Sequence, residues 1–359
     1  MKSYKFCLAV VSLLTDLLIT GCGYGSKALP LSSVAKAVAT LQPQTAPEVM
    51  VDAQAYSGLP NGIKITYTYG PSIIYTQGAY HMYFCSNGAG SNNLNWDNVR
   101  HESSTDLVHW SAPDNVLVPT VYERSNCDPS IVFSNGFYYL YYGGNVTTDQ
   151  TVVFVARSAN PDGPFLKYTP QGTWESQPAL SQIVIAPVNP DPTGTYYGAG
   201  EPSVVIRNGV FYMWYSDDTY TGSKPELWQT YLVTSRDGIN WTPAILTTGI
   251  PAGLGSIDVK YDPTIAEFVM VEINNDFTPT ANIAFQYSAD GIDWAGQVVA
   301  QAKLPPNAAN PGLSGDEQGN IIANSTVVGY GASYPGQTAE VWGDWDLWGN
   351  EFIRSSLVW

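Results

Sequence analysis

Three stretches of the chain repeat one pattern of residue types at one internal spacing. They read GPSIIY, DPSIVF and EPSVVI, and they begin at Gly70, Asp128 and Glu201. Each is followed, after a short turn that contains glycine, by an aromatic-rich run: AYHMYF, FYYLYY or VFYMWY. A weaker fourth copy aligns Asp258 with the three starting residues, and a fifth begins near Leu313. The starts lie about 57 residues apart with one insertion, which indicates five similar structural units.

Each unit has the composition of a small antiparallel sheet. Two β-rich runs flank the glycine turn, and a third run leads to a motif such as SRDGINW or SADGIDW, whose Asp-Gly pair is typical of a further turn. Five four-stranded units arranged radially form a five-bladed β-propeller. A long β-sandwich would also contain many short strands, but it would not explain a repeat of the whole unit. We therefore expect an all-β fold with four-stranded antiparallel blades.

Composition limits the partners of such a fold. The chain has 359 residues, with 15 Lys and Arg against 31 Asp and Glu, which gives a formal charge of −16. This charge repels a phosphate backbone, so we expect no nucleic acid partner. The chain contains 24 Tyr, 11 Trp and 11 Phe, and such rings suit either a sheet-rich core or a sugar-binding surface.

The first residues have the pattern of an export signal. Two lysines precede a mostly apolar run that ends in Ile-Thr-Gly-Cys, which resembles a bacterial lipoprotein signal with Cys22 as the lipidated residue. We expect residues 1–21 to be the signal peptide, residues 22–60 to be a tether rich in Ala, Ser, Pro and Gln, and residues 61–359 to form the propeller. The expected location is the bacterial cell envelope, with the lipid anchor as the sole membrane contact.

Export changes the interpretation of the cysteines. Once the signal is removed and Cys22 is lipidated, Cys85 and Cys127 remain, and such a pair in an oxidising compartment predicts a disulfide. The alternative is two buried free thiols. Two thiols alone do not make a zinc site, so we expect no metal.

The repeat also predicts a site. The first strand of each blade lines the central channel of a propeller, so Gly70, Asp128, Glu201 and Asp258 are expected to converge on one axial pocket. The proline that follows Asp128 and Glu201 suits the first position of a strand and keeps the preceding residue extended. In the alternative, these acids accept hydrogen bonds from turn amides and have no chemical role.

The motifs CDPSIVF, GEPSVVI and STDLVHW resemble those of the five-bladed propeller enzymes of glycoside hydrolase family 43, over roughly residues 63–348. The resemblance implies a glycosidase that acts on a poly- or oligosaccharide of arabinose or xylose type. It implies that Glu201 is the general acid and that Asp128 sets its pKa and orientation. Gly70 stands where the family has its catalytic base, and we expect Gly70 and Tyr69 to contact substrate instead. The second carboxylate would then be Asp258 or Asp128.

Three hypotheses follow from the substitution at Gly70. The protein is an active glycosidase, a carbohydrate-binding propeller that has lost hydrolysis, or a structural lipoprotein with a vestigial pocket. We expect a monomer without a cofactor. Calcium has no support in the sequence, because the late-blade histidine near which some relatives hold a central ion is missing.

Overall fold

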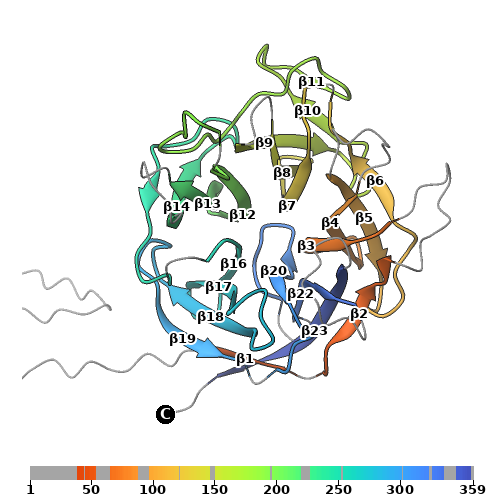
Figure 1. Cartoon of the computed structure of the whole chain (residues 1–359), viewed down its shortest axis with the longest axis vertical. Helices are drawn as coiled ribbons and strands as arrows, with labels where there is room; N and C mark the ends of the chain where they lie inside the picture. The colour runs from red at the N-terminus through yellow and green to blue at the C-terminus, as the bar shows by residue number, and fades with distance from the viewer. Residues whose placement is uncertain are drawn as a thin grey trace, which may run out of the picture. The chain divides into compact units, whose positions relative to one another are not determined.

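In the computed structural model, the repeated units become five sheets arranged around one central axis (Figure 1). The structure describes residues 39–43, 45–53, 65–87, 97–120, 122–145, 150–194, 196–219, 227–251, 254–300, 302–322, 326–334 and 345–356. All of them belong to the compact unit of residues 38–359. The predicted all-β five-bladed propeller is confirmed. The predicted signal and Cys22 lie outside the described residues.

Blades one to three follow one another in the sequence. Blade one contains β3 (Thr68–Thr76), β4 (Ala79–Asn87), β5 (Asp97–Ser104) and β6 (Asp114–Leu117). Blade two contains β7 (Asn126–Ser134), β8 (Phe137–Asn145), β9 (Thr151–Ser158), β10 (Leu166–Tyr168) and β11 (Trp174–Glu175). Blade three contains β12 (Ala199–Arg207), β13 (Val210–Thr219), β14 (Leu227–Ser235) and β15 (Ile245–Leu246). Among the described residues, no helix is long and apolar enough to cross a membrane.

Blades four and five complete the ring. Blade four contains β16 (Ile257–Asp262), β17 (Glu267–Asn274), β18 (Asn282–Ser288) and β19 (Ala295–Val299). Blade five contains β20 (Ala309–Leu313), β22 (Thr326–Ser333) and β23 (Trp345–Ser356), and β1 (Ala39–Pro43) and β2 (Glu48–Val51) pair with the outer side of β23. The short β21 (Gly315–Asp316) pairs in parallel with β3 of blade one. The two N-terminal strands lie within the stretch that the sequence predicted as a tether, and they extend the propeller domain to residue 38.

The hairpins at the start of blades one, two and three have the expected turn chemistry. Both central residues have positive φ in Gln77-Gly78, Asn135-Gly136 and Asn208-Gly209. This is the conformation of a type I′ turn, whose twist matches that of the flanking strands and which favours Asn and Gly. The predicted glycine turns are therefore present at the predicted positions.

The hydrophobic core lies between neighbouring blades, because each blade buries both of its faces. One cluster combines Val132 and Tyr141 of blade two with Val204 and Met213 of blade three. The aromatic runs recognised in the sequence supply many of these buried side chains, which explains why β4, β8 and β13 are rich in Tyr, Phe and Trp.

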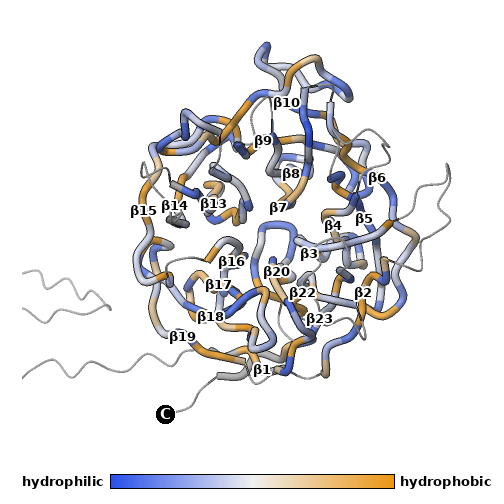
Figure 2. Tube along the Cα trace, in the orientation of Figure 1, coloured by the Kyte–Doolittle hydropathy of each residue, from blue (hydrophilic) through white to orange (hydrophobic). Residues whose placement is uncertain are grey.

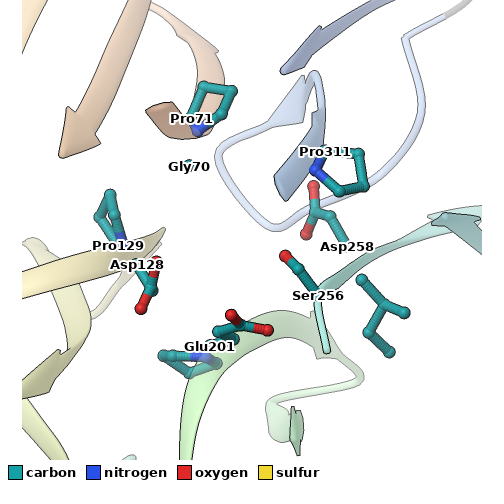
Figure 3. A pocket seen from close by; sticks show the side chains of 10 residues that line it. Gly70, Pro71, Asp128, Pro129, Glu201, Ser256, Asp258 and Pro311 are labelled. Carbon is teal, nitrogen blue, oxygen red and sulfur yellow. The ribbon is translucent and has the colours of Figure 1, made fainter. Parts of the chain in front are cut away.

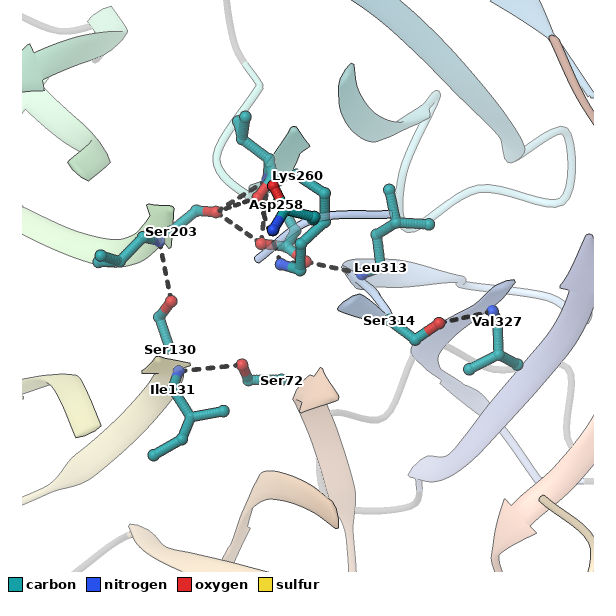
Figure 4. Close-up of polar contacts among 12 residues, drawn as sticks. Ser72, Ser130, Ile131, Ser203, Asp258, Lys260, Leu313, Ser314 and Val327 are labelled. Atoms are coloured by element: carbon teal, nitrogen blue, oxygen red, sulfur yellow. Dashed lines mark hydrogen bonds and ion pairs between the residues drawn. The ribbon is translucent and has the colours of Figure 1, made fainter. Parts of the chain in front are cut away.

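Side-chain clips join the first strand of each blade to the next (Figure 4). The backbone N–H groups of the following blade donate to the hydroxyls of Ser72, Ser130 and Ser203, from Ile131, Val204 and Val259 at 3.2, 2.9 and 2.8 Å. In blade four the acceptor is Asp258 Oδ2, which accepts from Leu313 N at 2.7 Å. Blade five has Gly312 at this position, and the β21–β3 pair joins it to blade one instead.

A turn from blade five closes one end of the central channel. This plug turn, residues 315–320, is a hydrophilic segment at the centre of the ring (Figure 2). Its carbonyl oxygens accept hydrogen bonds from the ends of the first strands of blades two, three and four: Phe133 N to Glu317 O, Ile206 N to Gln318 O and Tyr261 N to Gly319 O, at 2.6, 2.8 and 2.8 Å. The axial acids precede these strand ends in the sequence, so the plug turn lies at the other end of the channel.

We predict that Ser203→Ala destabilises the ring. The change removes a donor to the Asp258 carboxylate and one of the two acceptors of Val259 N–H, and the loss of a buried hydrogen bond to a charged group costs about 1–3 kcal/mol. The free energy of unfolding in urea measures the effect. Ser176→Ala, at an exposed serine of blade two, is the matched control and should stay within about 0.5 kcal/mol of wild type. Equal stability of the two variants would contradict the role of the clip.

Candidate active site

A β-bulge directs one residue of each first strand towards the axis. The pairing of β3, β7, β12 and β20 with its neighbour skips two residues, and the second of these is always proline. The first is Gly70, Asp128, Glu201 or Asn310, with φ of 60°, 47°, 51° and 52°. Positive φ costs a residue other than glycine of order 1–3 kcal/mol and is concentrated at functional sites. The bulge thus explains how a strand rich in core residues can begin with a carboxylate.

The structure corrects the predicted register of blades four and five. Asp258 pairs with Val271 as Ser203 pairs with Trp214, so Asp258 occupies the serine position of the repeat, two residues beyond the axial position. Ser256 lines the pocket at the axial position of blade four. In blade five the axial residue is Asn310, which precedes the predicted start near Leu313. The fourth blade lacks the proline and the bulge that would have revealed this offset.

Asp258 is therefore a poor candidate for a base, although it lines the pocket. Ser203 Oγ donates to its Oδ1 at 2.5 Å and Val259 N at 2.9 Å, while Lys260 Nζ and Leu313 N donate to its Oδ2 at 2.6 and 2.7 Å. A carboxylate offers about four lone-pair sites, and these donors account for all four. The contacts assign Asp258 to the closure of the ring.

The axial pocket is lined by the bulge residues and the prolines that follow them (Figure 3). Gly70, Asp128, Glu201, Ser256 and Asp258 lie around it, and a second set of lining residues comprises Pro71, Pro129, Pro202, Ile257 and Pro311. The structure thus brings together the three predicted catalytic residues and Gly70. The proline rings make the wall apolar, so charge in this pocket is concentrated on the carboxyl groups.

Asp128 is held by groups from blade one and from the segment that leads into blade three. Tyr197 OH donates to its Oδ2 at 3.1 Å, and its own backbone N–H points at Cys85 Sγ at 2.9 Å. Burial, and then the nearby carboxyl group of Asp97, raise the pKa of Asp128 to about 7, although the Tyr197 hydrogen bond lowers it. Asp97 accepts from Tyr67 OH at 2.6 Å, and burial raises its own pKa to about 6.

Gly70 leaves space that other groups fill. A Cβ at this position would lie 3.3 Å from Asp128 Oδ1 and 3.4 Å from Cys85 Sγ. An aspartate side chain in the base position would therefore be crowded by Asp128 and by the disulfide. The Asp128 carboxylate already occupies part of the space that the missing base would need.

The predicted disulfide is confirmed. Cys85 of β4 and Cys127 of β7 are bonded, with their Cα atoms 5.1 Å apart, and the bond joins blades one and two directly beside Asp128. Tyr69 OH lies 2.9 Å from Cys127 Sγ, and because a disulfide sulfur carries no proton, the tyrosine is the donor. Both sulfurs are thereby unavailable as thiolate ligands of a metal.

Glu201 is the more perturbed of the two axial acids. Burial first, and then the charges of Asp128 and Asp276, raise the pKa of Glu201 well above its usual range. Asn310 Nδ2 donates weakly to Oε1 at 3.5 Å, and Oε2 is buried without a hydrogen bond. These effects favour the protonated form of Glu201, and its Oε2 makes no hydrogen bond within the described part of the chain.

Aromatic rings surround the acids. Tyr197 and Trp228 lie with their ring centroids 5.0 Å apart beside Glu201, and Phe277 stacks on Trp345 at 5.5 Å. Tyr69, predicted to contact substrate, is 4% exposed and packs edge-on against Trp345 at 6.1 Å. Tyr69 thus supports the wall of the site from behind.

Four further residues of the site were not found from the sequence. Asp97, Tyr197 and Asp276 lie on segments outside the repeat motif, so no local pattern indicated that they would meet at the axis. Asn310 did have a signal, because the pair Asn-Pro stands where blade two has Asp-Pro. Aligning on that pair would have given the correct start of the fifth repeat.

Comparisons with known proteins agree with the predicted resemblance. Residues 59–180 match the model of the glycosyl hydrolases family 43, and this match covers the first two blades with Asp128. A fructan 6-exohydrolase of Triticum aestivum is 30% identical over 140 residues, which are 35% of this chain and 22% of the relative. The insoluble isoenzyme 6 of β-fructofuranosidase from Oryza sativa subsp. japonica is similar to the same extent, with 30% identity over 139 residues and 22% of its length covered.

Solved structures share the architecture. The catalytic domain of a family 62 α-L-arabinofuranosidase from Coprinopsis cinerea aligns with a TM-score of 0.60 at 10% identity, over 88% of this chain and 97% of that one. A family 117 glycoside hydrolase from the marine bacterium Zobellia galactanivorans aligns with a TM-score of 0.57 at 16% identity, over 88% of this chain and 90% of that one. At these identities the likeness shows the fold. Fold and family match together define a five-bladed propeller that resembles glycoside hydrolase family 43 in its first two blades.

We predict that Glu201→Gln stabilises the protein at neutral and alkaline pH. The unfolded carboxyl ionises at a pKa of about 4.3, whereas the folded one resists ionisation, so the wild type loses stability as pH rises above that value. The glutamine amide of the variant does not ionise, so the variant does not lose this stability as pH rises. The melting temperature of the variant should equal that of wild type near pH 4 and exceed it by more than about 2 °C at pH 8. Glu351→Gln, at an exposed residue, is the control, and a pH-independent difference would contradict the prediction.

We also predict that the disulfide contributes substantially to stability. The bond closes a loop with a sequence separation of 42, and its loss should cost about 4 kcal/mol in the chain-entropy model. Urea unfolding of wild type with and without reductant, and of the double variant Cys85→Ala/Cys127→Ala, measures this cost. Reductant should not affect the variant. Alkylation of Cys85 and Cys127 in the denatured, unreduced wild type would refute the bond itself.

Proposed function

We propose that the protein hydrolyses glycosidic bonds at the axial pocket, with Glu201 as general acid and Asp128 as the second carboxylate. The observation that carries this proposal is a pair of partly buried acids in one pocket with raised pKa values, that of Asp128 to about 7 and that of Glu201 well above its usual range. Pairs of titratable groups with separated pKa values are typical of acid and base partners. The family match over blades one and two supports the same reaction class.

The division of labour follows from the two environments. Glu201, whose raised pKa favours the protonated form, donates its proton to the glycosidic oxygen as the bond to the anomeric carbon breaks. Asp128, with a pKa of about 7, is largely ionised in mildly alkaline solution and accepts a proton from the water that attacks that carbon. Asp97 then takes the role of the neighbour that sets the pKa of the base. The roles are displaced from the pattern that the family resemblance implied, because Gly70 contributes no carboxylate.

The plug turn supports a substrate that enters from one side. It lies beyond the prolines, at the other end of the channel from the acids, so we infer that substrate reaches the acids from the opposite face and presents the end of a sugar chain. We infer a glycan with a terminal arabinose, xylose or similar sugar. Export by the N-terminal signal and anchoring through Cys22 in the cell envelope would place this activity where such glycans are encountered.

Gly70 favours one alternative function, a sugar-binding propeller without hydrolysis. If Asp128 cannot reach an attacking water, the pocket retains its aromatic walls and its hydrogen-bonding acids but lacks a base. Both functions take a carbohydrate ligand, and turnover separates them.

We predict that Glu201→Gln lowers kcat by about 10² to 10⁴-fold on substrates with poor leaving groups, because general acid catalysis contributes this much. Asp128→Asn should lower kcat to a similar extent, and azide should restore part of its activity if Asp128 acts as base. Turnover of arabinose-, xylose-, galactose- and fructose-based substrates measures both effects.

Asp258→Asn is the control for this experiment, because Asp258 lines the same pocket but joins neighbouring blades through its hydrogen bonds. It should lower the melting temperature, while the fraction that remains folded keeps its kcat. Binding of oligosaccharides without any hydrolysis by the wild type would establish the non-catalytic alternative. A large loss of kcat in folded Asp258→Asn, restored by azide, would transfer the role of base to Asp258.

A further inference from the structure

Blade four differs from the other blades at one buried position. The sixth residue of the second strand is Phe84 in blade one, Tyr142 in blade two and Tyr215 in blade three, and all three are buried aromatics. In blade four this residue is Glu272, which is fully buried. Burying a carboxyl group in place of an aromatic ring is unfavourable unless polar partners accompany it.

Glu272 has such partners. Gln286 Nε2 lies 3.2 and 3.4 Å from its two oxygens, and Gln297 Nε2 donates to Oε1. Burial raises the pKa of Glu272, while these hydrogen bonds lower it. The polar cluster therefore orients the amide of Gln297, which is exposed on β19.

A groove of about 510 Å³ lies over this cluster. We call it the blade-four groove, and its lining residues are Pro251, Leu254, Asn274, Asn275, Asp276, Asn282, Gln297 and Val299. Asn274 and Asn282 face each other across β17 and β18. Asn282 Nδ2 donates to Thr280 O at 3.2 Å, and its Oδ1 is buried without a partner. Gln297 Nε2 also lies 3.4 Å from Asn274 Oδ1.

The groove begins beside the general acid. Leu254 lines it, and the next residue, Gly255, lies so close to the acid that a Cβ there would be 3.9 Å from Glu201 Oε2. Asp276, another lining residue, is near enough for its charge to act on Glu201. Glu201 lines the axial pocket, and the Leu254-Gly255 segment and Asp276 bring the groove close to it.

The chemistry of the lining suits sugar hydroxyls. Amide side chains offer both donors and acceptors, as hydroxyl groups require, and Pro251, Leu254 and Val299 supply apolar surface for C–H groups. The volume is within the range of roughly 300–1,000 Å³ that is usual for small-molecule sites. An acid that protonates the leaving oxygen must lie next to the leaving group.

We propose that the blade-four groove binds the sugar unit on the leaving-group side of the scissile bond. This inference rests on the proposed function and narrows its substrate: the protein acts on oligo- or polysaccharides in preference to glycosides with small aglycones. The terminal sugar lies at the axial pocket, and the remainder of the chain continues across blade four.

The test compares variants of the groove on substrates of different length. Asn282→Ala and Gln297→Ala should each lower kcat/KM by about 10-fold on arabino-, xylo- or fructo-oligosaccharides of two to five units, since a lost hydrogen bond to ligand is worth about 1 kcal/mol or more. Both should leave kcat/KM on the matching p-nitrophenyl glycoside unchanged. Gln318→Ala, an exposed amide on the plug turn, is the matched control and should affect neither substrate.

A binding measurement separates the groove from the chemistry. In the Glu201→Gln background, calorimetric titration with the same oligosaccharides should show the same length-dependent loss of affinity in the groove variants. Asn282→Ala removes one bond to Thr280 O, so it tests the groove even if Gln297→Ala disturbs Glu272 and unfolds the protein. If the wild type binds or hydrolyses these sugars and the groove variants do so equally well, the groove is not the binding site, and the proposed function still stands. A wild type that neither binds nor hydrolyses any of these sugars would overturn both.

Discussion

The hydrogen bond that joins the first strands of blades two to five to a side chain of the preceding blade is the interaction on which the molecule depends. It fixes the rotation of one blade relative to the next, and the bulge lies immediately before the clip residue. The side chain at the bulge can therefore point only towards the axis. Three serines and Asp258 provide these clips, and the disulfide adds a covalent link where blades one and two carry Gly70 and Asp128. The contacts that close the ring therefore also position the residues of the site.

The architecture could be predicted from the sequence because each repeat corresponds to one blade. Turns such as Asn135-Gly136 indicate where the hairpin of a blade lies. The site could be predicted in part. Asp128 and Glu201 lie within strong copies of the motif and meet as expected, whereas Asp258 was misaligned because blade four has neither the proline nor the bulge. Asp97 could not be found because it begins β5, which carries no copy of the motif, and Tyr197 could not be found because it lies just outside the motif of blade three, four residues before Glu201. The N-terminal strands were missed because their composition resembles a tether.

The site places carboxyl groups close together beside the proline rings of a small pocket. The charge of Asp97 raises the pKa of Asp128, and the charges of Asp128 and Asp276 raise that of Glu201, while the amine of Lys260 pairs with Asp258. A charged carboxyl group makes its neighbour harder to ionise, so the protonated forms of Asp128 and Glu201 are favoured. Gly70 adds no further carboxyl group to this repulsion, and a Cβ there would lie close to Asp128 and to the disulfide.

The plug turn has a consequence for the order in which the chain can fold. Its carbonyl oxygens satisfy the strand ends at Phe133, Ile206 and Tyr261, which are synthesised well before residues 317–319. Until the last blade has left the ribosome, these inner N–H groups have no partner from the chain, and the channel is open at both ends. The earlier blades can form as individual hairpins, but they gain their final inner contacts together, when the fifth arrives. Folding of this propeller is thus tied to the completion of its synthesis.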